Sequence, residues 1–130
     1  MGILLMKKKM EETKQDIQTC LVPRWQLLKS TLNNLEFESF VRKATTHPNA
    51  CILDVRTPAE FYTGSLEGAI NLDYLSQDLA DELEALPKEK TYFVLCKTSR
   101  RSIRICVILQ NAGFPNVYNL DTGLQHRTFE

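Results

Sequence analysis

Short apolar runs separated by polar segments recur along the chain and indicate a sheet of buried strands. These runs cover 51–55, 69–72, 92–95 and 117–120. The run at 92–95 reads Tyr-Phe-Val-Leu without alternation of apolar and polar residues, which is typical of a parallel strand covered on both faces. Residues 24–28 are predicted as an additional strand at the edge of the sheet.

Apolar residues at helical spacing lie between these runs. The spacing predicts helices over 37–44, 75–86 and 103–111. Asn33 and Glu36, three residues apart, resemble a capping arrangement for the first of these helices. Strands that alternate with helices predict an α/β domain with a largely parallel sheet.

The length, composition and charge narrow the class of protein. A chain of 130 residues favours one domain, which we expect over 23–130, preceded by a mobile extension over 1–22. Sixteen basic and sixteen acidic side chains give a net charge of zero, which argues against a nucleic-acid partner. No apolar run approaches the roughly 18 residues that cross a bilayer. The N-terminus has no secretory signal pattern, so we expect a cytoplasmic protein without membrane contact.

The four cysteines form no C-x-x-C pair, and their spacing to His47 and His126 is not that of a zinc site, so no metal is expected. Cys51 and Cys106 lie in apolar stretches and are predicted core residues. Cys20 belongs to the extension. We expect His47 and His126 to serve as exposed or capping residues.

The remaining cysteine, Cys96, opens a polar turn between a buried strand and a helix. Ligands bind outside the carboxyl ends of the strands in open parallel sheets. The positive end of the helix dipole and the unpaired N–H groups of this turn favour a thiolate. Four cationic side chains and no acid lie within nine residues, namely Lys97, Arg100, Arg101 and Arg104. The turn therefore predicts a nucleophilic cysteine that faces a small anion such as thiosulfate, phosphate, arsenate or a persulfide. The alternative is a cysteine that merely ends a strand, followed by a solvated helix start.

Five motifs in order over about 27–126 make the chain resemble the rhodanese-like domains. They are Ile-Leu-Asp-Val-Arg-Thr-Pro-Ala-Glu-Phe at 52–61, Gly-Ser-Leu-Glu-Gly-Ala-Ile-Asn at 64–71, Cys-Lys-Thr-Ser-Arg-Arg-Ser at 96–102, Gly-Phe-Pro-Asn-Val-Tyr-Asn-Leu at 113–120 and Asp-Thr-Gly at 121–123. The chain departs from the family pattern at Ser65, usually His, at Ser99, commonly Gly, and at 121–123, usually Gly-Gly. The tryptophan expected near Arg127 is absent.

The resemblance implies a five-stranded, mostly parallel sheet flanked by helices on both faces, and a thiosulfate sulfurtransferase-like enzyme without metal or organic cofactor. Cys96 would carry sulfane sulfur as a persulfide, from an anionic donor such as thiosulfate to cyanide, a thiol or a protein acceptor. The expected substrate-binding loop consists of Lys97, Thr98, Ser99, Arg100, Arg101 and Ser102. Within it, Lys97 and Arg101 are the first candidates for orienting the donor.

Two other functions remain open at this point. A thiol phosphatase or arsenate reductase on a related fold uses Cys-x5-Arg, whereas Cys96 and Arg101 form the shorter Cys-x4-Arg, which favours sulfur transfer. A non-catalytic rhodanese-like binding or sulfur-carrier module is the main rival. Asp54 and Arg56 are expected to support the loop, chiefly through structure, and Glu60 to close a helix capping box. The acids over 73–89 are expected to form a solvated helix face, or alternatively a docking surface for a basic partner.

Overall fold

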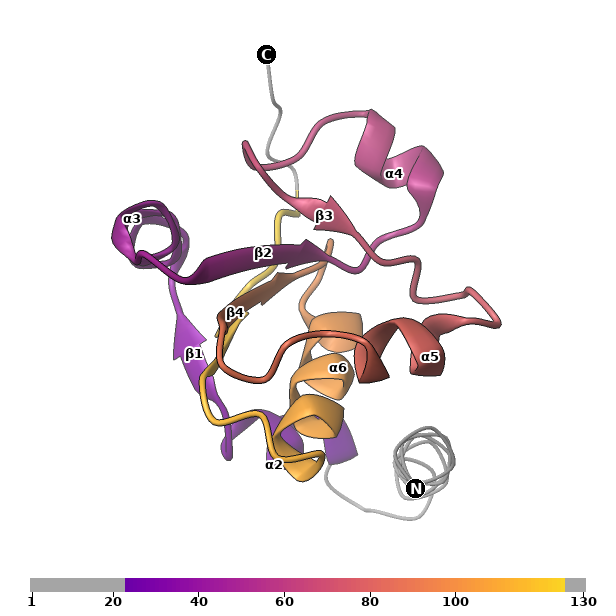
Figure 1. The fold of residues 1–130 in the computed structure, drawn as a ribbon. Coiled ribbons are helices and arrows are strands. Elements are labelled where there is room, and N and C mark those ends of the chain that lie inside the picture. The colour runs from indigo at the N-terminus through magenta and orange to yellow at the C-terminus, as the bar shows by residue number, and fades with distance from the viewer. Residues whose placement is uncertain (1–22, 126–130) are drawn as a thin grey trace.

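The computed structural model describes residues 23–125, so the predicted extension over 1–22 lies outside the described residues. Five strands form one sheet, namely β1 (Asn33–Leu35), β2 (Ala50–Asp54), β3 (Ile70–Asn71), β4 (Thr91–Leu95) and β5 (Val117–Leu120). Their order is β1-β5-β4-β2-β3, and every neighbouring pair is parallel. The α/β fold expected from the sequence is confirmed (Figure 1).

The central strand β4 is buried along its whole length because helices cover both faces of the sheet. Successive side chains of a strand point to opposite faces. Val94 therefore packs beneath α5 (Leu79–Glu84) and α6 (Arg100–Asn111), while Phe93 packs beneath α3 (Phe37–Thr46). Figure 1 shows α3 on one side of the sheet and α5 with α6 on the other.

Residues 24–28 form a helix, so the predicted edge strand there is wrong. The segment belongs to α2 (Arg24–Lys29), which packs against α6 and ends in a turn closed by the hydroxyls of Ser30 and Thr31. The edge strand is instead β1, which pairs with β5. Asn33 consequently lies in a strand, and Glu36 occupies the N-cap position of α3 without a side-chain cap bond. The capping arrangement predicted for these two residues is therefore wrong.

The helix predicted over 75–86 is shorter than expected and begins at Leu79. The residues before it form turns in which the Asp73 carboxylate and the Ser76 hydroxyl accept from backbone N–H groups of Leu75 and Asp78. Such local side-chain bonds compete with helix formation. Among residues 23–125, no helix has the length and apolar character needed to cross a membrane.

Candidate active site

Cys96 directly follows the central strand β4, and its turn leads into α6. The segment after β5 fixes the start of this turn. The Leu124 N–H donates to the Cys96 carbonyl at 2.9 Å, and the Gln125 N–H donates to the Lys97 carbonyl at 2.6 Å. Gly123 permits this approach, because a Cβ there would lie 2.4 Å from the Lys97 carbonyl oxygen and its φ is +71°.

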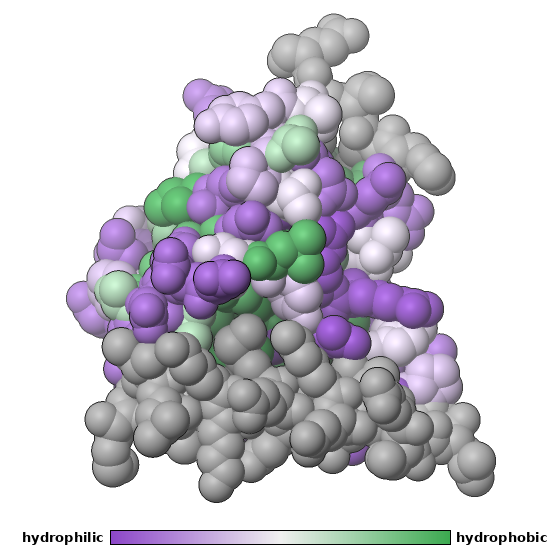
Figure 2. Space-filling view, turned by 90° about the vertical axis from the view of Figure 1, so that its right-hand side faces the viewer, coloured by the Kyte–Doolittle hydropathy of each residue, from purple (hydrophilic) through white to green (hydrophobic). Residues whose placement is uncertain are grey.

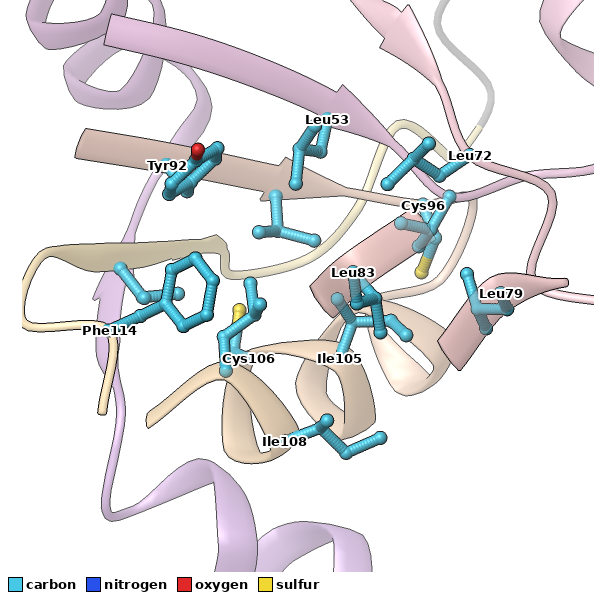
Figure 3. Packing of buried hydrophobic residues seen from close by; sticks show 14 of the residues in the cluster. Leu53, Leu72, Leu79, Leu83, Tyr92, Cys96, Ile105, Cys106, Ile108 and Phe114 are labelled. Atoms are coloured by element: carbon cyan, nitrogen blue, oxygen red, sulfur yellow. The ribbon is translucent and has the colours of Figure 1, made fainter. Parts of the chain in front are cut away.

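The sulfur of Cys96 lies at the amino end of the 12-residue helix α6. The Ser102 N–H donates to Sγ at 3.4 Å, and the thiol donates to Ser102 Oγ at 3.5 Å. The side chain is fully buried, and Figure 3 shows its sulfur on the side of the sheet that carries Leu79 and Leu83. Free N–H groups and the helix dipole at this position favour a negatively charged sulfur.

A buried polar network lies beneath the turn, and the sequence analysis did not identify it. Asn119, from β5, is fully buried and donates through Nδ2 to Ser99 Oγ at 3.0 Å and to Asn34 Oδ1 at 2.9 Å. Its Oδ1 accepts from Ser102 Oγ at 2.6 Å. The network holds Ser99 in a left-handed conformation with φ +76°, which a residue with a side chain seldom adopts.

Asp54 and Arg56 form a buried ion pair at the carboxyl end of β2. Arg56 Nε lies 2.9 Å from Asp54 Oδ1, and one of its terminal nitrogens lies 2.7 Å from Oδ2. The Ser65 hydroxyl donates to Oδ2 at 2.6 Å, and the guanidinium also donates to the Gly64 carbonyl at 2.6 Å. Asn71 caps the same strand end by donating to the carbonyls of both charged residues. The pair therefore links the carboxyl end of β2 to the Gly64–Ser65 segment, and its supporting role for the cysteine turn stays a prediction.

Arg101 is bound by Glu60, which belongs to α4 (Pro58–Tyr62). Two guanidinium nitrogens lie 2.9 and 3.2 Å from the two carboxylate oxygens. The predicted capping box is confirmed, because Thr57 and Glu60 exchange side-chain and backbone bonds at the start of α4. The hydrogen bonds from Arg101 lower the pKa of Glu60 to about 2, and the same carboxylate raises the pKa of Arg101.

The other cations of the turn have different surroundings. The Arg100 guanidinium lies 4.8 Å from the centroid of the Trp25 ring, and Arg104 donates to the Tyr74 hydroxyl at 3.1 Å. Lys97 is exposed, as is Thr98. The structure therefore brings Cys96, Ser99 and Ser102 together, while the arginines make contacts with α2, α4 and the segment before α5.

The comparisons with known proteins decide the family. A model of the rhodanese-like domain matches residues 36–126. The chain belongs to the rhodanese-like domain family. It is 26% identical to a sulfurtransferase of Allochromatium vinosum over 72% of this chain and 85% of that protein. It is 32% identical to the thiosulfate sulfurtransferase GlpE of Stutzerimonas stutzeri over 63% of this chain and 73% of that protein. A rhodanese-related protein of Thermoplasma volcanium has a similar structure, with a TM-score of 0.62 and 25% identity over 72% of this chain and 87% of that one.

Three of the four departures from the rhodanese-like pattern have a local structural explanation. Ser65, in place of His, still binds the buried carboxylate of Asp54. Ser99, in place of Gly, keeps the left-handed backbone because its hydroxyl accepts from Asn119. Gly123 preserves the glycine that the close approach to the cysteine turn requires. The position of the absent tryptophan, near residue 127, lies outside the described residues.

The other candidate side chains lie away from Cys96 or outside the described residues. Cys106 is a buried core residue, as predicted, and burial raises the pKa of its thiol well above the usual value. The prediction of a core residue is wrong for Cys51, which is half-buried and packs at the margin of the core; partial burial raises the pKa of its thiol. A surface hollow of about 370 Å³ is lined by Cys51 at the opposite end of the sheet and does not include Cys96. His47 is the exposed C-cap of α3, as expected. Cys20 and His126 lie outside the described residues. Among residues 23–125, no three His, Cys, Asp or Glu side chains are grouped to hold a metal ion.

Proposed function

We propose that this rhodanese-like protein is a sulfurtransferase that carries sulfane sulfur on Cys96. The observation that supports this most directly is the position of the sulfur at the amino end of α6, where it accepts a hydrogen bond from the Ser102 N–H. Relatives named as sulfurtransferases are 26% and 32% identical to this chain over 72% and 63% of its length. We expect no metal or organic cofactor, because a thiolate alone suffices for the transfer.

The proposed reaction has two displacement steps. The Cys96 thiolate attacks the sulfane sulfur of thiosulfate; an Sγ–S bond forms, the S–S bond of thiosulfate breaks, and sulfite leaves with the bonding electrons. Cyanide or a thiolate acceptor then attacks the terminal sulfur of the persulfide, and the Cys96 thiolate leaves. Backbone N–H groups at the start of α6 stabilise the negative charge of the Cys96 thiolate and of the Cys96 persulfide.

The donor reaches the sulfur only when the turn opens, because the Cys96 side chain is fully buried. Lys97 and Thr98 directly follow Cys96 in the chain and are exposed, so we propose that they form the entrance. Lys97 attracts the anionic donor, whereas Arg101 acts on it less directly because Glu60 binds its guanidinium.

The contact between Glu60 and Arg101 also disfavours phosphoryl transfer. An oxyanion held by Arg101 would have to displace a carboxylate that binds two of the guanidinium nitrogens. Such bidentate pairs are among the stronger hydrogen-bonded arrangements in proteins. Sulfur transfer needs no such displacement, because the attack takes place at Cys96.

The test of sulfur transfer is a mass measurement followed by turnover. Incubation with thiosulfate is expected to add one sulfur atom to the intact protein, and cyanide is expected to yield thiocyanate. Cys96→Ala should lose both, whereas the matched variant Cys51→Ala, at the far end of the sheet, should keep both. Full turnover in Cys96→Ala refutes the site. A persulfide that forms without thiocyanate production indicates a sulfur-carrier module. If neither the persulfide nor thiocyanate forms, the proposed enzymatic activity is refuted. Aryl phosphate hydrolysis that depends on Cys96 identifies a phosphatase instead.

The test of donor attraction uses two charge reversals. Lys97→Glu is expected to raise the KM for thiosulfate on the order of fivefold, because each exposed charge contributes about 1 kcal/mol at close range. Lys90→Glu, with the same charge change at the other end of β4, is the control. The difference should disappear in 1 M salt, which screens exposed charges. Equal KM values for the two variants contradict the entrance role of Lys97.

A further inference from the structure

The side-chain amide of Asn34 has a fixed orientation. Its Nδ2 donates to the Lys29 carbonyl at 2.9 Å and to the Leu32 carbonyl at 3.3 Å. Carbonyl oxygens accept and do not donate, so the amide nitrogen must face them. The Oδ1 of Asn34 is consequently the atom presented to Asn119, as its 2.9 Å distance from Asn119 Nδ2 shows.

This orientation determines that of Asn119. Both hydrogens of its Nδ2 are used, one toward Asn34 Oδ1 and one toward Ser99 Oγ. Its Oδ1 therefore faces Ser102, whose hydroxyl oxygen lies 2.6 Å away. An amide oxygen only accepts, so at this contact the Ser102 hydroxyl must donate.

The Ser102 hydroxyl has one proton and three neighbouring acceptors. They are Asn119 Oδ1 at 2.6 Å, the Ser99 carbonyl at 2.9 Å and Cys96 Sγ at 3.5 Å. The two nearer oxygens hold the proton, so the hydroxyl presents a lone pair to the sulfur. With the Ser102 N–H as a donor on the sulfur, this set of contacts suits a neutral thiol, which both donates and accepts.

We propose that Asn119 is a positioning residue that holds the Ser102 hydroxyl proton away from Cys96 while the sulfur is a thiol. When the thiol loses its proton to a base in solution, the hydroxyl turns and donates to the thiolate, and its bonds to Asn119 Oδ1 and to the Ser99 carbonyl break. The network thus opposes ionisation of Cys96 at rest. The relevance to catalysis rests on the proposed function, in which Cys96 is the nucleophile.

The charged and titratable groups around the sulfur act in addition to this network. On α6, Arg101 and Cys106 interact electrostatically with Cys96, and Arg101 is paired with Glu60 of α4. On β2, Asp54 is neutralised by its buried pair with Arg56. The facing side chains of α5 are apolar. None of these groups is altered when Asn119 is replaced, so its effect can be measured separately.

The experiment is the pH profile of Cys96 alkylation by iodoacetamide in the full-length protein, followed by peptide mass spectrometry. The midpoint of the profile reports ionisation, and the plateau rate at high pH reports access to the sulfur. Asn119→Ala is expected to lower the midpoint by at most about one pH unit, which is up to tenfold more thiolate below the midpoint, because the Ser99 carbonyl still competes for the hydroxyl proton. Ser102→Ala and the double variant Asn119→Ala/Ser102→Ala should share one midpoint, because the effect acts through the hydroxyl.

A merely structural role of Asn119 would change the melting temperature and the plateau rate and leave the midpoint unchanged. An unchanged midpoint in Asn119→Ala overturns the proposal. The proposal is also overturned if Asn119→Ala shifts the midpoint equally in wild type and in the Ser102→Ala variant. If Asn119→Ala does not fold, Asn34→Ala loosens the same amide from outside and should lower the midpoint by less than one unit; no shift there also overturns the proposal. Alkylation needs no sulfur donor. If the wild-type protein forms no persulfide while the variants show the expected midpoint shifts, the proposed function is contradicted and the positioning role of Asn119 stands.

Discussion

Replacing Asp54 with alanine leaves the Arg56 guanidinium buried without its carboxylate. Asp54 is fully buried and Arg56 is 6% exposed, so solvent cannot replace the lost partner. Removing one member of such a pair costs about 3–5 kcal/mol. The domain is expected to have about 5–15 kcal/mol of total stability, so the variant should lose a large part of it. The free energy of unfolding is measured by urea denaturation with Trp25 fluorescence.

Two controls separate the ion pair from its other contacts. Ser65→Ala removes one hydrogen bond to the same carboxylate and should cost about 1 kcal/mol. The double variant Asp54→Leu/Arg56→Met replaces both charges by apolar groups and should recover most of the loss. A cost below 1 kcal/mol for Asp54→Ala would refute the structural interpretation. So would a stable variant that has lost sulfur transfer, because that result assigns the pair to function.

Two further predictions concern the surroundings of the cysteine turn. Gly123→Ala should lower the free energy of unfolding by about 1–3 kcal/mol and reduce thiocyanate production, because the new Cβ would overlap the Lys97 carbonyl at a positive φ. An unchanged melting temperature and turnover would show that the close approach of Gly123 to Lys97 does not constrain the turn. Glu60, with its pKa lowered to about 2, stabilises the fold fully above the pKa of the unfolded chain, and this contribution is lost as pH falls through about 2. Wild type and Glu60→Gln should therefore differ in the free energy of unfolding by less than about 1 kcal/mol, because the pair is partly exposed. This difference should be constant above pH 5 and shrink between pH 5 and 3. A difference that stays constant between pH 5 and 3 contradicts the pairing of Glu60 with Arg101.

The sheet could be predicted from the sequence because its strands are buried on both faces. An uninterrupted apolar run such as 92–95 has few alternatives to a central parallel strand. Residues 24–28 have no such pattern, and their helix depends on tertiary contacts, including the Arg100 guanidinium over the Trp25 ring. Local sequence does not contain that information, which explains why an edge strand was predicted there.

The position of Cys96 could also be predicted, because it depends on order along the chain: a buried strand, a polar turn and then a helix. The network beneath the turn could not. Asn34 and Asn119 lie far from Cys96 in the sequence and meet only because β1 pairs with β5. The single available signal was a polar residue inside the apolar run at 117–120. A buried side-chain amide in a strand requires hydrogen-bonding partners, and here two of them, Ser99 and Ser102, belong to the cysteine turn.

The four cations that follow Cys96 do not all face a bound anion, although their number in the sequence suggests it. Four cations follow Cys96 in the sequence, yet Arg101 is bound by Glu60 and Arg100 lies over an aromatic ring. The Ser102 N–H, in contrast, is directed at the sulfur. In the proposed function, attraction of the donor and stabilisation of the thiolate are therefore separate tasks. There Lys97 would serve the first from the exposed edge of the turn, and the buried backbone at the start of α6 would serve the second. Salt should consequently weaken the attraction of the donor by Lys97 much more than it weakens the buried hydrogen bond at the sulfur, because buried interactions are screened much less than exposed ones.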